Sequence, residues 1–343
     1  MRARVRAAVE RLTHVIHEDV SHLESRARIE ALALELHAWQ RRQSPLLDAL
    51  ADGASPARLE DIPAVPVQLY KELDIATFPT MDAKVVFRTS GTTQGTRGTV
   101  YLRDTSLYDL GARAHAHACI TDLPLQVVSL CSHADDSSLG HMVADFAGGT
   151  QVACFDLTHG VSPDTWATLR GADAPVFLAC TAFALDALFE LPGHAALDAR
   201  SVVMVTGGFK GRHTRLDAPG LYQAIAQRLG TPRVVGEYGM TELSSQLWTE
   251  PVAAGRVPGA FRAPPWMHVY TVDPVSGAPI AGEGLLRFVD LCNVDSSLAI
   301  ETLDLGIVRF HAGAQWVELR GRLAGSEARG CSLTVEELRL AAR

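Results

Sequence analysis

The chain has 343 residues, of which 47% are hydrophobic and 20% are charged, and its formal net charge is -8 at pH 7. This composition is typical of a soluble globular protein with a large core, and the acidic balance excludes a basic nucleic-acid-binding surface. The best candidate for a membrane span, residues 175–185, is stopped by Asp186 short of the roughly 18 residues required. The N-terminus lacks the apolar core of a signal peptide, so we expect a cytoplasmic protein that binds small molecules or another protein, with no membrane or nucleic-acid partner.

Taken in chain order, the elements predict an α/β fold. Residues 1–50 have helical apolar spacing, and residues 51–80 form a proline-punctuated connector. Short β-rich runs then alternate with helices, which favours a largely parallel core sheet. From about residue 266 the pattern changes to hairpins, and the chain ends with capping-box spacing typical of a short helix. The expected helices of the alternating region are 105–120, 163–171, 182–191 and 219–229. The expected segments are an N-terminal helical part at 1–80, an α/β core at 81–320 and a tail at 321–343.

The stretch FRTSGTTQGTRGTVYLRD, residues 87–104, places a loop rich in hydroxyl groups and glycine between two predicted strands. Its backbone N–H groups, its hydroxyls and the guanidinium of Arg97 could wrap a polyphosphate. No helix follows the loop, so it is neither a Walker P-loop nor a Rossmann turn. The alternative is an ordinary polar hairpin turn. The candidate phosphate-binding residues are Thr89, Ser90, Gly91, Thr92, Thr93, Gly95 and Arg97.

Two further stretches follow predicted strands. VVGEYGMTELSSQLWTE, residues 234–250, offers polar side chains at the carboxyl end of a strand, where ligands bind in open α/β sheets. VVMVTGGFKGR, residues 202–212, runs into Gly207 and Gly208, where the backbone is able to approach a planar ring closely. These two strand ends are the second and third candidate sites, against the alternative of ordinary strand-end residues.

The cysteines show no C-x-x-C pair and no framework spacing, so neither disulfides nor a zinc site is indicated. Four of them lie in apolar strings and are expected in the core: Cys119, Cys154, Cys180 and Cys292. Cys331 differs, because it lies near the C-terminus in LAGSEARGCSLTVEEL. A nearby cation such as Arg329 or Arg322 would raise its thiolate fraction, which makes Cys331 a candidate nucleophile; the alternative is an incidental thiol on a tail.

Five motifs in order resemble the acyl-adenylate-forming superfamily over about residues 85–332. TSGTTQGTRG is similar to its phosphate loop, VTGG to its adenine-side glycine turn, YGMTE to its adenylate and magnesium motif, IETLDLG to its ribose-binding strand and GRLAGSEARGCS to its hinge motif. The resemblance implies layered α/β subdomains like the N-terminal domain of those enzymes, with largely parallel sheets, a C-terminal hairpin region and no mobile C-terminal domain. It also implies that Glu242 holds magnesium. The nucleotide would be bound by the loop residues above and by Gly207, Gly208, Glu237, Tyr238, Gly239, Thr241, Asp304 and Arg322.

Within that superfamily the chain is most similar to the LuxE-type acyl-protein synthetases, on FRTSGTTQGT, EYGMTELSSQ, GLLRFVDLCNVDSS and GSEARGCS. The resemblance implies an enzyme that activates a carboxylic acid with ATP and magnesium and carries the acyl group on Cys331 as a thioester. A protein acceptor, either a reductase or an acyl carrier protein, would then receive the acyl group. Compared with the usual phosphate loop, Gln94 replaces a glycine, Thr96 a proline and Arg97 a lysine. An acyl-CoA donor used by an ATP-independent transacylase, and a non-catalytic nucleotide-binding subunit, stay open as alternatives.

Two groups of histidines give weaker signals. His115 and His117 lie on a predicted helix, where residues two apart point about 200° apart and cannot share a metal. CSHADDSSLGHM, residues 131–142, clusters His133 with acidic residues after a predicted strand. This cluster would either border an acyl pocket or form a solvated loop.

Overall fold

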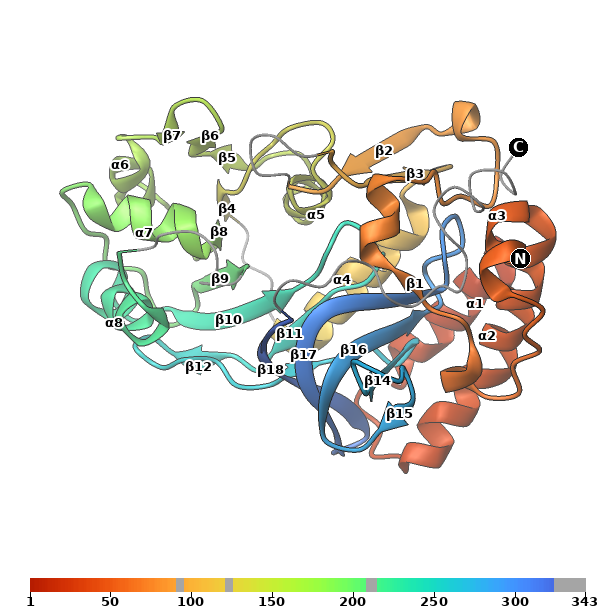
Figure 1. Ribbon diagram of the computed structural model, residues 1–343. Helices are drawn as coiled ribbons and strands as arrows, with labels where there is room; N and C mark the ends of the chain where they lie inside the picture. Colours follow the sequence, from red (N-terminus) through yellow and green to blue (C-terminus); the bar gives the residue numbers. More distant parts are fainter. Residues whose placement is uncertain (91–95, 121–125, 208–214, 324–343) are drawn as a thin grey trace. The chain divides into compact units, whose positions relative to one another are not determined.

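The computed structural model describes residues 1–90, 96–120, 126–207 and 215–323 (Figure 1). The chain forms two compact units, which we call unit 1 and unit 2. Unit 1 comprises the described residues of Met1–Ala114, Met240–Gln246 and Arg262–Arg343, and unit 2 those of His115–Gly239 and Leu247–Phe261. The helix α4 (Ser106–Ile120) and the short strand β13 (Phe261–Arg262) each contain a unit boundary.

Unit 2 is built on a mostly parallel sheet. Its strands β4, β5, β8, β9 and β10 pair in parallel, in the order β10-β9-β8-β4-β5, and β11 and β12 each pair antiparallel with β10. The elements are β4 (Gln126–Leu130), α5 (Ser138–Phe146), β5 (Val152–Ala153), β6 (Phe155–Asp156), β7 (Gly160–Val161), α6 (Thr165–Arg170), β8 (Val176–Thr181), α7 (Ala182–Glu190), β9 (Val202–Thr206), α8 (Ala218–Leu229), β10 (Arg233–Tyr238), β11 (Leu247–Thr249) and β12 (Val252–Ala253). The alternation expected from the sequence is confirmed here.

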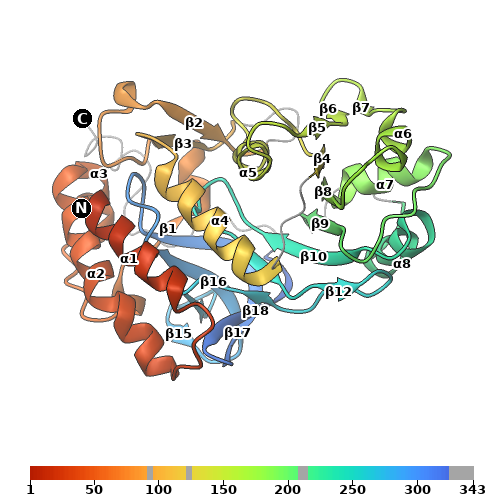
Figure 2. The same cartoon turned by 180° about the vertical axis from the view of Figure 1, so that it is seen from behind.

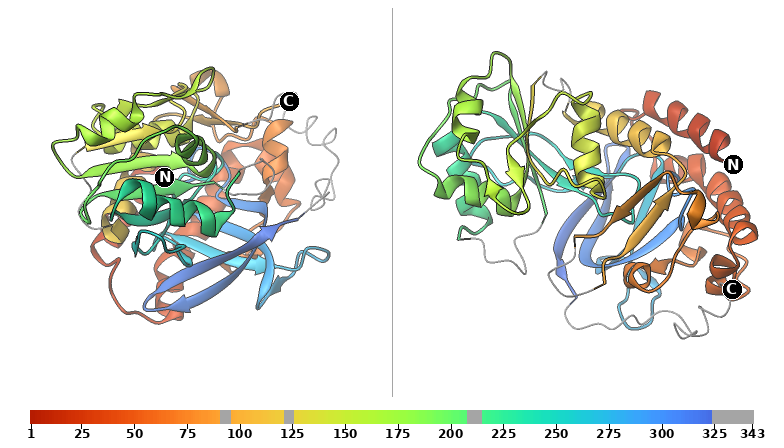
Figure 3. Two further views of the ribbon diagram at one scale, coloured as in Figure 1. Left: turned by 90° about the vertical axis from the view of Figure 1, so that its left-hand side faces the viewer. Right: turned by 90° about the horizontal axis from the view of Figure 1, so that it is seen from above.

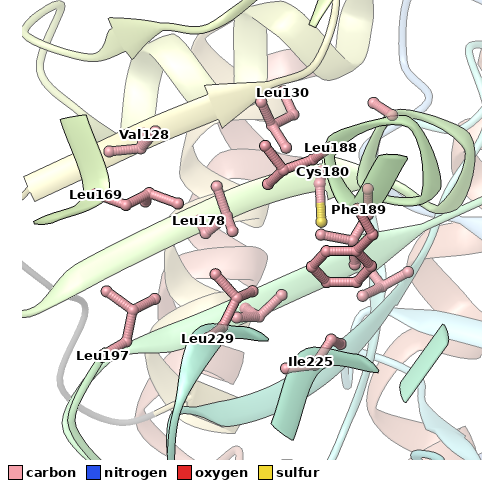
Figure 4. Packing of buried hydrophobic residues seen from close by; sticks show 14 of the residues in the cluster. Val128, Leu130, Leu169, Leu178, Cys180, Leu188, Phe189, Leu197, Ile225 and Leu229 are labelled. Atoms are coloured by element: carbon pink, nitrogen blue, oxygen red, sulfur yellow. The ribbon is translucent and has the colours of Figure 1, made fainter. Parts of the chain in front are cut away.

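The core of unit 2 explains why its central strands are apolar throughout. Every residue of β9 is buried, as is typical of parallel strands that are covered on both faces. Leu178 and Cys180 of β8 pack with Leu188 of α7 and Ile225 of α8 (Figure 4). Figure 3 shows α7 and α8, in green and teal, beside these strands. The helix α8 begins where the Asp217 side chain accepts a hydrogen bond from the N–H of Gly220.

Unit 1 is built on an antiparallel sheet in the order β15-β14-β16-β17-β18, to which β1 adds one parallel pairing with β17. Its elements are α1 (Arg2–His14), α2 (His22–Gln43), α3 (Pro45–Ala51), η1 (Leu59–Asp61), β1 (Val65–Pro66), η2 (Val67–Lys71), η3 (Thr80–Asp82), β2 (Val85–Arg88), β3 (Thr99–Leu102), β14 (Met267–Val272), β15 (Pro279–Ile280), β16 (Glu283–Asp290), β17 (Ala299–His311) and β18 (Ala314–Arg322). The change to hairpins near residue 266 is confirmed, and parallel pairing is concentrated in unit 2.

The N-terminal helices pack on the sheet of unit 1 (Figure 2). Val9 of α1 and Leu36 of α2 are fully buried and share a core with Val289 of β16. A capping box starts α2, because Ser21 and Glu24 exchange side-chain and backbone hydrogen bonds. The helical pattern expected for residues 1–50 is confirmed by α1, α2 and α3. The three sequence segments proposed above stay a prediction.

A buried loop between β16 and β17, residues 291–298, is fixed by α2. The Gln40 amide nitrogen donates to the carbonyl oxygens of Asn293 at 2.7 Å and Ser296 at 2.6 Å, and its amide oxygen accepts from the N–H of Leu298 at 3.0 Å. Burying a loop requires partners for its backbone polar groups, and Gln40 supplies four of them, the fourth being a contact with the Val294 carbonyl oxygen at 3.3 Å. Tyr70 also binds this loop, since its hydroxyl lies 2.8 Å from the Ser296 Oγ.

Candidate functional site

The predicted phosphate loop begins on a two-stranded antiparallel hairpin, β2 and β3. The hairpin closes at Thr89, whose N–H donates to the carbonyl oxygen of Gly98 and whose Oγ1 accepts from the Gly98 N–H, both at 2.9 Å. Ser90 is exposed. Four predicted loop residues lie outside the described residues: Gly91, Thr92, Thr93 and Gly95. The hairpin position predicted for the loop is therefore confirmed.

Arg97 braces the base of this hairpin. Its Nε donates to the carbonyl oxygen of Thr89 at 2.6 Å, and its NH2 group donates to that of Arg88 at 3.2 Å. These contacts hold the guanidinium against the backbone of the strand ends. Arg97 therefore fixes the entry to the predicted loop, in addition to any charge it presents to an anion.

Glu242 is one of the buried acidic residues of unit 1. It lies in a turn after Thr241, is 7% exposed, and its backbone carbonyl accepts a hydrogen bond from the Asn293 side-chain amide at 2.9 Å. The Asn293 side chain also accepts from the N–H of Ser244 at 2.8 Å, so the buried loop 291–298 positions the turn. Burial raises the pKa of Glu242 to about 7, against opposing effects of its own backbone N–H and of the positive charges of Arg322 and Lys71.

Asp304 and Arg322 lie opposite each other on β17 and β18, with 3.8 Å between the Arg322 Nε and the Asp304 Oδ1. Arg322 is more exposed than its partner, with side chains 63% and 25% exposed, respectively. The positive charge of Arg322 also lowers the pKa of Glu242. Unit 1 therefore brings three of the predicted site residues, Glu242, Asp304 and Arg322, into one electrostatic group. We call Glu242, Asp304, Arg322 and Lys71 the unit 1 charge cluster.

Lys71 was missed by the sequence analysis. It ends η2 and is exposed, and its charge acts on Glu242. One signal in the sequence could have found it: the chain has only three lysines, Lys71, Lys84 and Lys210, among its 31 basic residues. Lys210 lies outside the described residues.

In unit 2, the ends of β9 and β10 meet through a side-chain hydrogen bond. Thr206, the last residue of β9, donates its hydroxyl to the carboxylate of Glu237. Burial raises the pKa of Glu237 to about 7, which the Thr206 hydrogen bond opposes. Gly207 follows directly with φ +82°, a left-handed conformation that favours glycine, and space is open where a Cβ would be. Gly208 lies outside the described residues.

Tyr238 and Gly239 follow Glu237 at the carboxyl end of β10. The Tyr238 ring lies 5.9 Å from the Phe261 ring, tilted by 57°, and both Tyr238 and Gly239 are half-buried. The carboxyl ends of the parallel strands β9 and β10 thus carry Gly207, Glu237 and Tyr238 at one edge of the sheet of unit 2, the position at which open α/β sheets bind ligands.

The weaker sequence signals have ordinary structural surroundings. Cys154, Cys180 and Cys292 are buried, as expected, whereas Cys119 is only partly buried and lies 3.8 Å from the ring nitrogens of His115. The cluster after β4 leads into α5, and burial lowers the pKa of His133. Within the described ranges, no group of three His, Cys, Asp or Glu side chains could hold a metal by itself. Cys331 lies outside the described residues.

No family model matches the chain, and no curated protein matches its sequence. Solved structures do match. A 2-hydroxyisobutyryl-CoA ligase, in the postadenylation state with R3-HIB-AMP, is similar with a TM-score of 0.69 at 14% identity, over 89% of this chain and 69% of the ligase. An open conformation of that ligase with 2-HIB-AMP and CoA gives a TM-score of 0.67 at 14% identity, over 92% and 79%.

The amide bond synthetase McbA from Marinactinospora thermotolerans is also similar, with a TM-score of 0.52 at 19% identity over 72% of this chain and 50% of McbA. The ligase structure in the postadenylation state shows that this fold supports adenylation in that enzyme. At such identities the similarity establishes the fold alone. The chain therefore has the α/β fold of the N-terminal domain of adenylate-forming enzymes, as predicted. Among the residues whose structure is described, no helix combines the length and apolarity needed to cross a bilayer.

Proposed function

We propose that this chain activates a carboxylic acid with ATP, carries the acyl group on Cys331 as a thioester and passes it to a protein acceptor. One observation carries the proposal: on an adenylate-forming fold, unit 1 gathers Glu242, Asp304 and Arg322 from three separate motifs into one charge cluster. The proposed reaction needs a reduced thiol at Cys331 and a supply of ATP, and the cytoplasm provides both conditions.

In the first half-reaction, a carboxylate oxygen of the acid attacks the α-phosphorus of ATP. The bond to the β-phosphate oxygen breaks, pyrophosphate leaves, and an acyl-AMP remains. The negative charge that develops on the phosphates is stabilised by preorganised donors and cations. We assign this task to the backbone N–H groups of the predicted loop, to Arg97 at its base and to Arg322 of the charge cluster. Asp304 accepts hydrogen bonds from ribose hydroxyls, and the strand ends Gly207, Glu237, Tyr238 and Gly239 bind the adenine side.

Glu242 fits the magnesium role proposed for it. Magnesium is held in proteins by one or two carboxylates together with substrate phosphates, and it prefers carboxylate oxygen. Burial disfavours the ionised form of Glu242, which is the form that a cation would stabilise. A magnesium ion bound at Glu242 would supply neutralisation of phosphate charge. Asn293 holds the backbone of this residue, so the carboxylate is presented from a fixed turn.

In the second half-reaction, the Cys331 thiolate attacks the acyl carbonyl carbon, and AMP leaves as a thioester forms. A thiol or another nucleophile of the acceptor protein, either a reductase or an acyl carrier protein, then attacks the thioester and frees Cys331. Arg329 would support the reaction by raising the thiolate fraction of the neighbouring Cys331.

A second candidate is an ATP-independent transacylase that takes its acyl group from acyl-CoA and uses the same Cys331 thioester. The changes at Gln94, Thr96 and Arg97 favour it, because Arg97 donates to the carbonyls of its own hairpin. A non-catalytic nucleotide-binding subunit is the third candidate. The three candidates differ in whether pyrophosphate is exchanged and in whether the protein becomes acylated.

The first test is acid-dependent exchange of labelled pyrophosphate into ATP, over a panel of carboxylic acids with magnesium present. We expect exchange, and we expect Asp304→Ala to weaken ATP binding about tenfold because a ribose acceptor is lost. Asp82→Ala, which removes an exposed carboxylate of unit 1 on η3, is the matched control and should leave exchange unchanged. In parallel, intact-mass spectrometry after incubation with the matching acyl-CoA measures whether the protein gains an acyl group.

The outcomes separate the candidates. The absence of exchange with every acid, together with one added acyl mass from acyl-CoA, would establish the transacylase. If the protein binds nucleotide but shows neither pyrophosphate exchange nor acylation, the non-catalytic nucleotide-binding subunit is the candidate that remains. Partial recovery of a weakened Glu242→Ala variant by excess magnesium would support the metal role of Glu242.

A further inference from the structure

We propose that Lys71 binds the β- and γ-phosphates of the nucleotide, the part that leaves as pyrophosphate. The inference rests on the proposed use of ATP and extends it to a residue that none of the sequence motifs contains. Lys71 belongs to the unit 1 charge cluster, together with Glu242 and Arg322.

The backbone that carries Lys71 is fixed although its side chain is exposed. Tyr70, the residue before it, is 2% exposed, and its hydroxyl is hydrogen-bonded to Ser296 in the buried loop. Leu69 is buried as well, and its carbonyl accepts from the N–H groups of Glu72 and Leu73. An ammonium group on a rigid turn is presented to a ligand with a smaller loss of chain entropy than one on a mobile loop.

The segment η2 also lies at the foot of the predicted phosphate hairpin. A Cβ placed on Gly98 would meet the Tyr70 Cβ at 3.4 Å and the Thr89 Cγ2 at 3.1 Å. The hairpin therefore closes directly against the residue that precedes Lys71. The strands β17 and β18 carry Asp304 and Arg322, the predicted ribose and hinge residues. Lys71 thus follows a residue that packs against the base of the phosphate hairpin, whereas Asp304 lies on β17.

The charge of Lys71 also favours an anion as its ligand. Arg322 already has Asp304 as its ion-pair partner. Lys71 makes no ion pair with any residue of the described ranges, and Glu242, whose pKa its charge lowers, is buried. A cation that has no carboxylate partner among the described residues, and that follows a residue packed at the base of the hairpin carrying Thr89, is suited to a phosphate group. Lysine serves well here because its ammonium donates three hydrogen bonds in rotatable directions.

Calorimetric titration with ATP and with AMP, both with magnesium and without any acid, tests the assignment directly. AMP lacks the phosphates that Lys71 is proposed to contact. We expect Lys71→Gln to weaken ATP binding about tenfold, the loss typical of one charge-assisted hydrogen bond, with AMP binding unchanged. Lys71→Arg should keep most of the ATP affinity. Lys84→Gln, which removes another exposed lysine of unit 1, is the control and should bind both nucleotides like the wild-type protein.

Each result decides one of the two proposals. If the wild-type protein binds ATP and Lys71→Gln binds it equally well, Lys71 has no phosphate role and the proposed function stands. Equal losses for ATP and AMP would also reject the assignment, because they would indicate a general effect on the cluster. If the wild-type protein binds no nucleotide, the proposed function fails and the Lys71 assignment fails with it.

Discussion

Glu237 is a buried carboxyl whose ionisation opposes folding. Burial raises its pKa from the ordinary 4.5 to about 7, so the native state holds a proton between these values that the unfolded state has released. The contribution of this residue to the free energy of unfolding therefore falls as pH rises from about 4.5 to about 7, and is constant outside that window. Glutamine keeps the oxygen that accepts from Thr206 and cannot ionise.

We accordingly expect Glu237→Gln to leave stability unchanged at pH 4.5 and to increase it at pH 8, by up to about 3 kcal/mol. Urea unfolding at several pH values measures the difference. Glu60→Gln is the control of opposite sign: although burial raises the pKa of Glu60, hydrogen bonds from His268 and Arg26 lower it overall. Glu60 therefore stabilises the fold at neutral pH, and its replacement should destabilise the protein there. A Glu237→Gln variant that is less stable than wild type at pH 8 would refute the assignment.

At the scale of elements, α2 acts as a support for the loop between β16 and β17. Gln40 satisfies polar groups of Asn293, Ser296 and Leu298, and Asn293 in turn holds the turn of Glu242. Gln40→Leu would leave those buried backbone groups without partners. We expect it to reduce the free energy of unfolding by at least about 3 kcal/mol, since three buried groups are left unsatisfied and each costs roughly 1 to 3 kcal/mol.

The matched control is Gln43→Leu, which makes the same change at an exposed residue of α2, where an effect within about 0.5 kcal/mol is expected. Thermal or urea unfolding of both variants measures the contrast. Equal destabilisation of the two would mean that helix propensity, and not the loop contact, explains the result. Because the loop reaches Glu242, Gln40→Leu should also slow pyrophosphate exchange under conditions in which the protein is still folded.

At the scale of the whole molecule, the proposed reaction has two half-reactions that depend on different parts of the chain. The residues assigned to acyl-AMP formation are Lys71, Asp304 and Arg322 and those of 89–98, 207–208 and 237–242, whereas the proposed acyl carrier Cys331 lies beyond Arg322. Cys331→Ser should therefore retain pyrophosphate exchange and lose transfer to the acceptor. In the wild-type protein, intact-mass spectrometry should detect one acyl group that neutral hydroxylamine removes, on a tryptic peptide containing Cys331. Transfer by Cys331→Ser at the wild-type rate would mean that the acceptor attacks the bound acyl donor directly.

The sequence predicted features that depend on local pattern. The alternation of β-rich runs and helices predicted the parallel sheet of unit 2, and the hydroxyl-rich loop between KVVFR and TVYLR predicted the hairpin β2–β3. Contacts between distant residues left no such signal. Gln40 reads as one polar residue of a helix, and its role depends on a loop more than 250 positions away. Lys71 ends a short 3-10 helix, where no periodicity marks it; apart from the rarity of lysine in the chain, its effect on the pKa of Glu242 is what distinguishes it.

The packing of α1 and α2 on the C-terminal sheet has a consequence for synthesis on the ribosome. Gln40 gains its hydrogen-bond partners only after the ribosome has made residues 253 positions further along the chain. Val9 and Leu36 are likewise covered only after β16 has been made. At about 5 to 20 residues per second, that interval lasts roughly 10 to 50 s. The segments of unit 2 are made in between. The N-terminal helices of the nascent chain therefore expose apolar surface until β16 has been made, and we expect a chaperone to bind them in that interval.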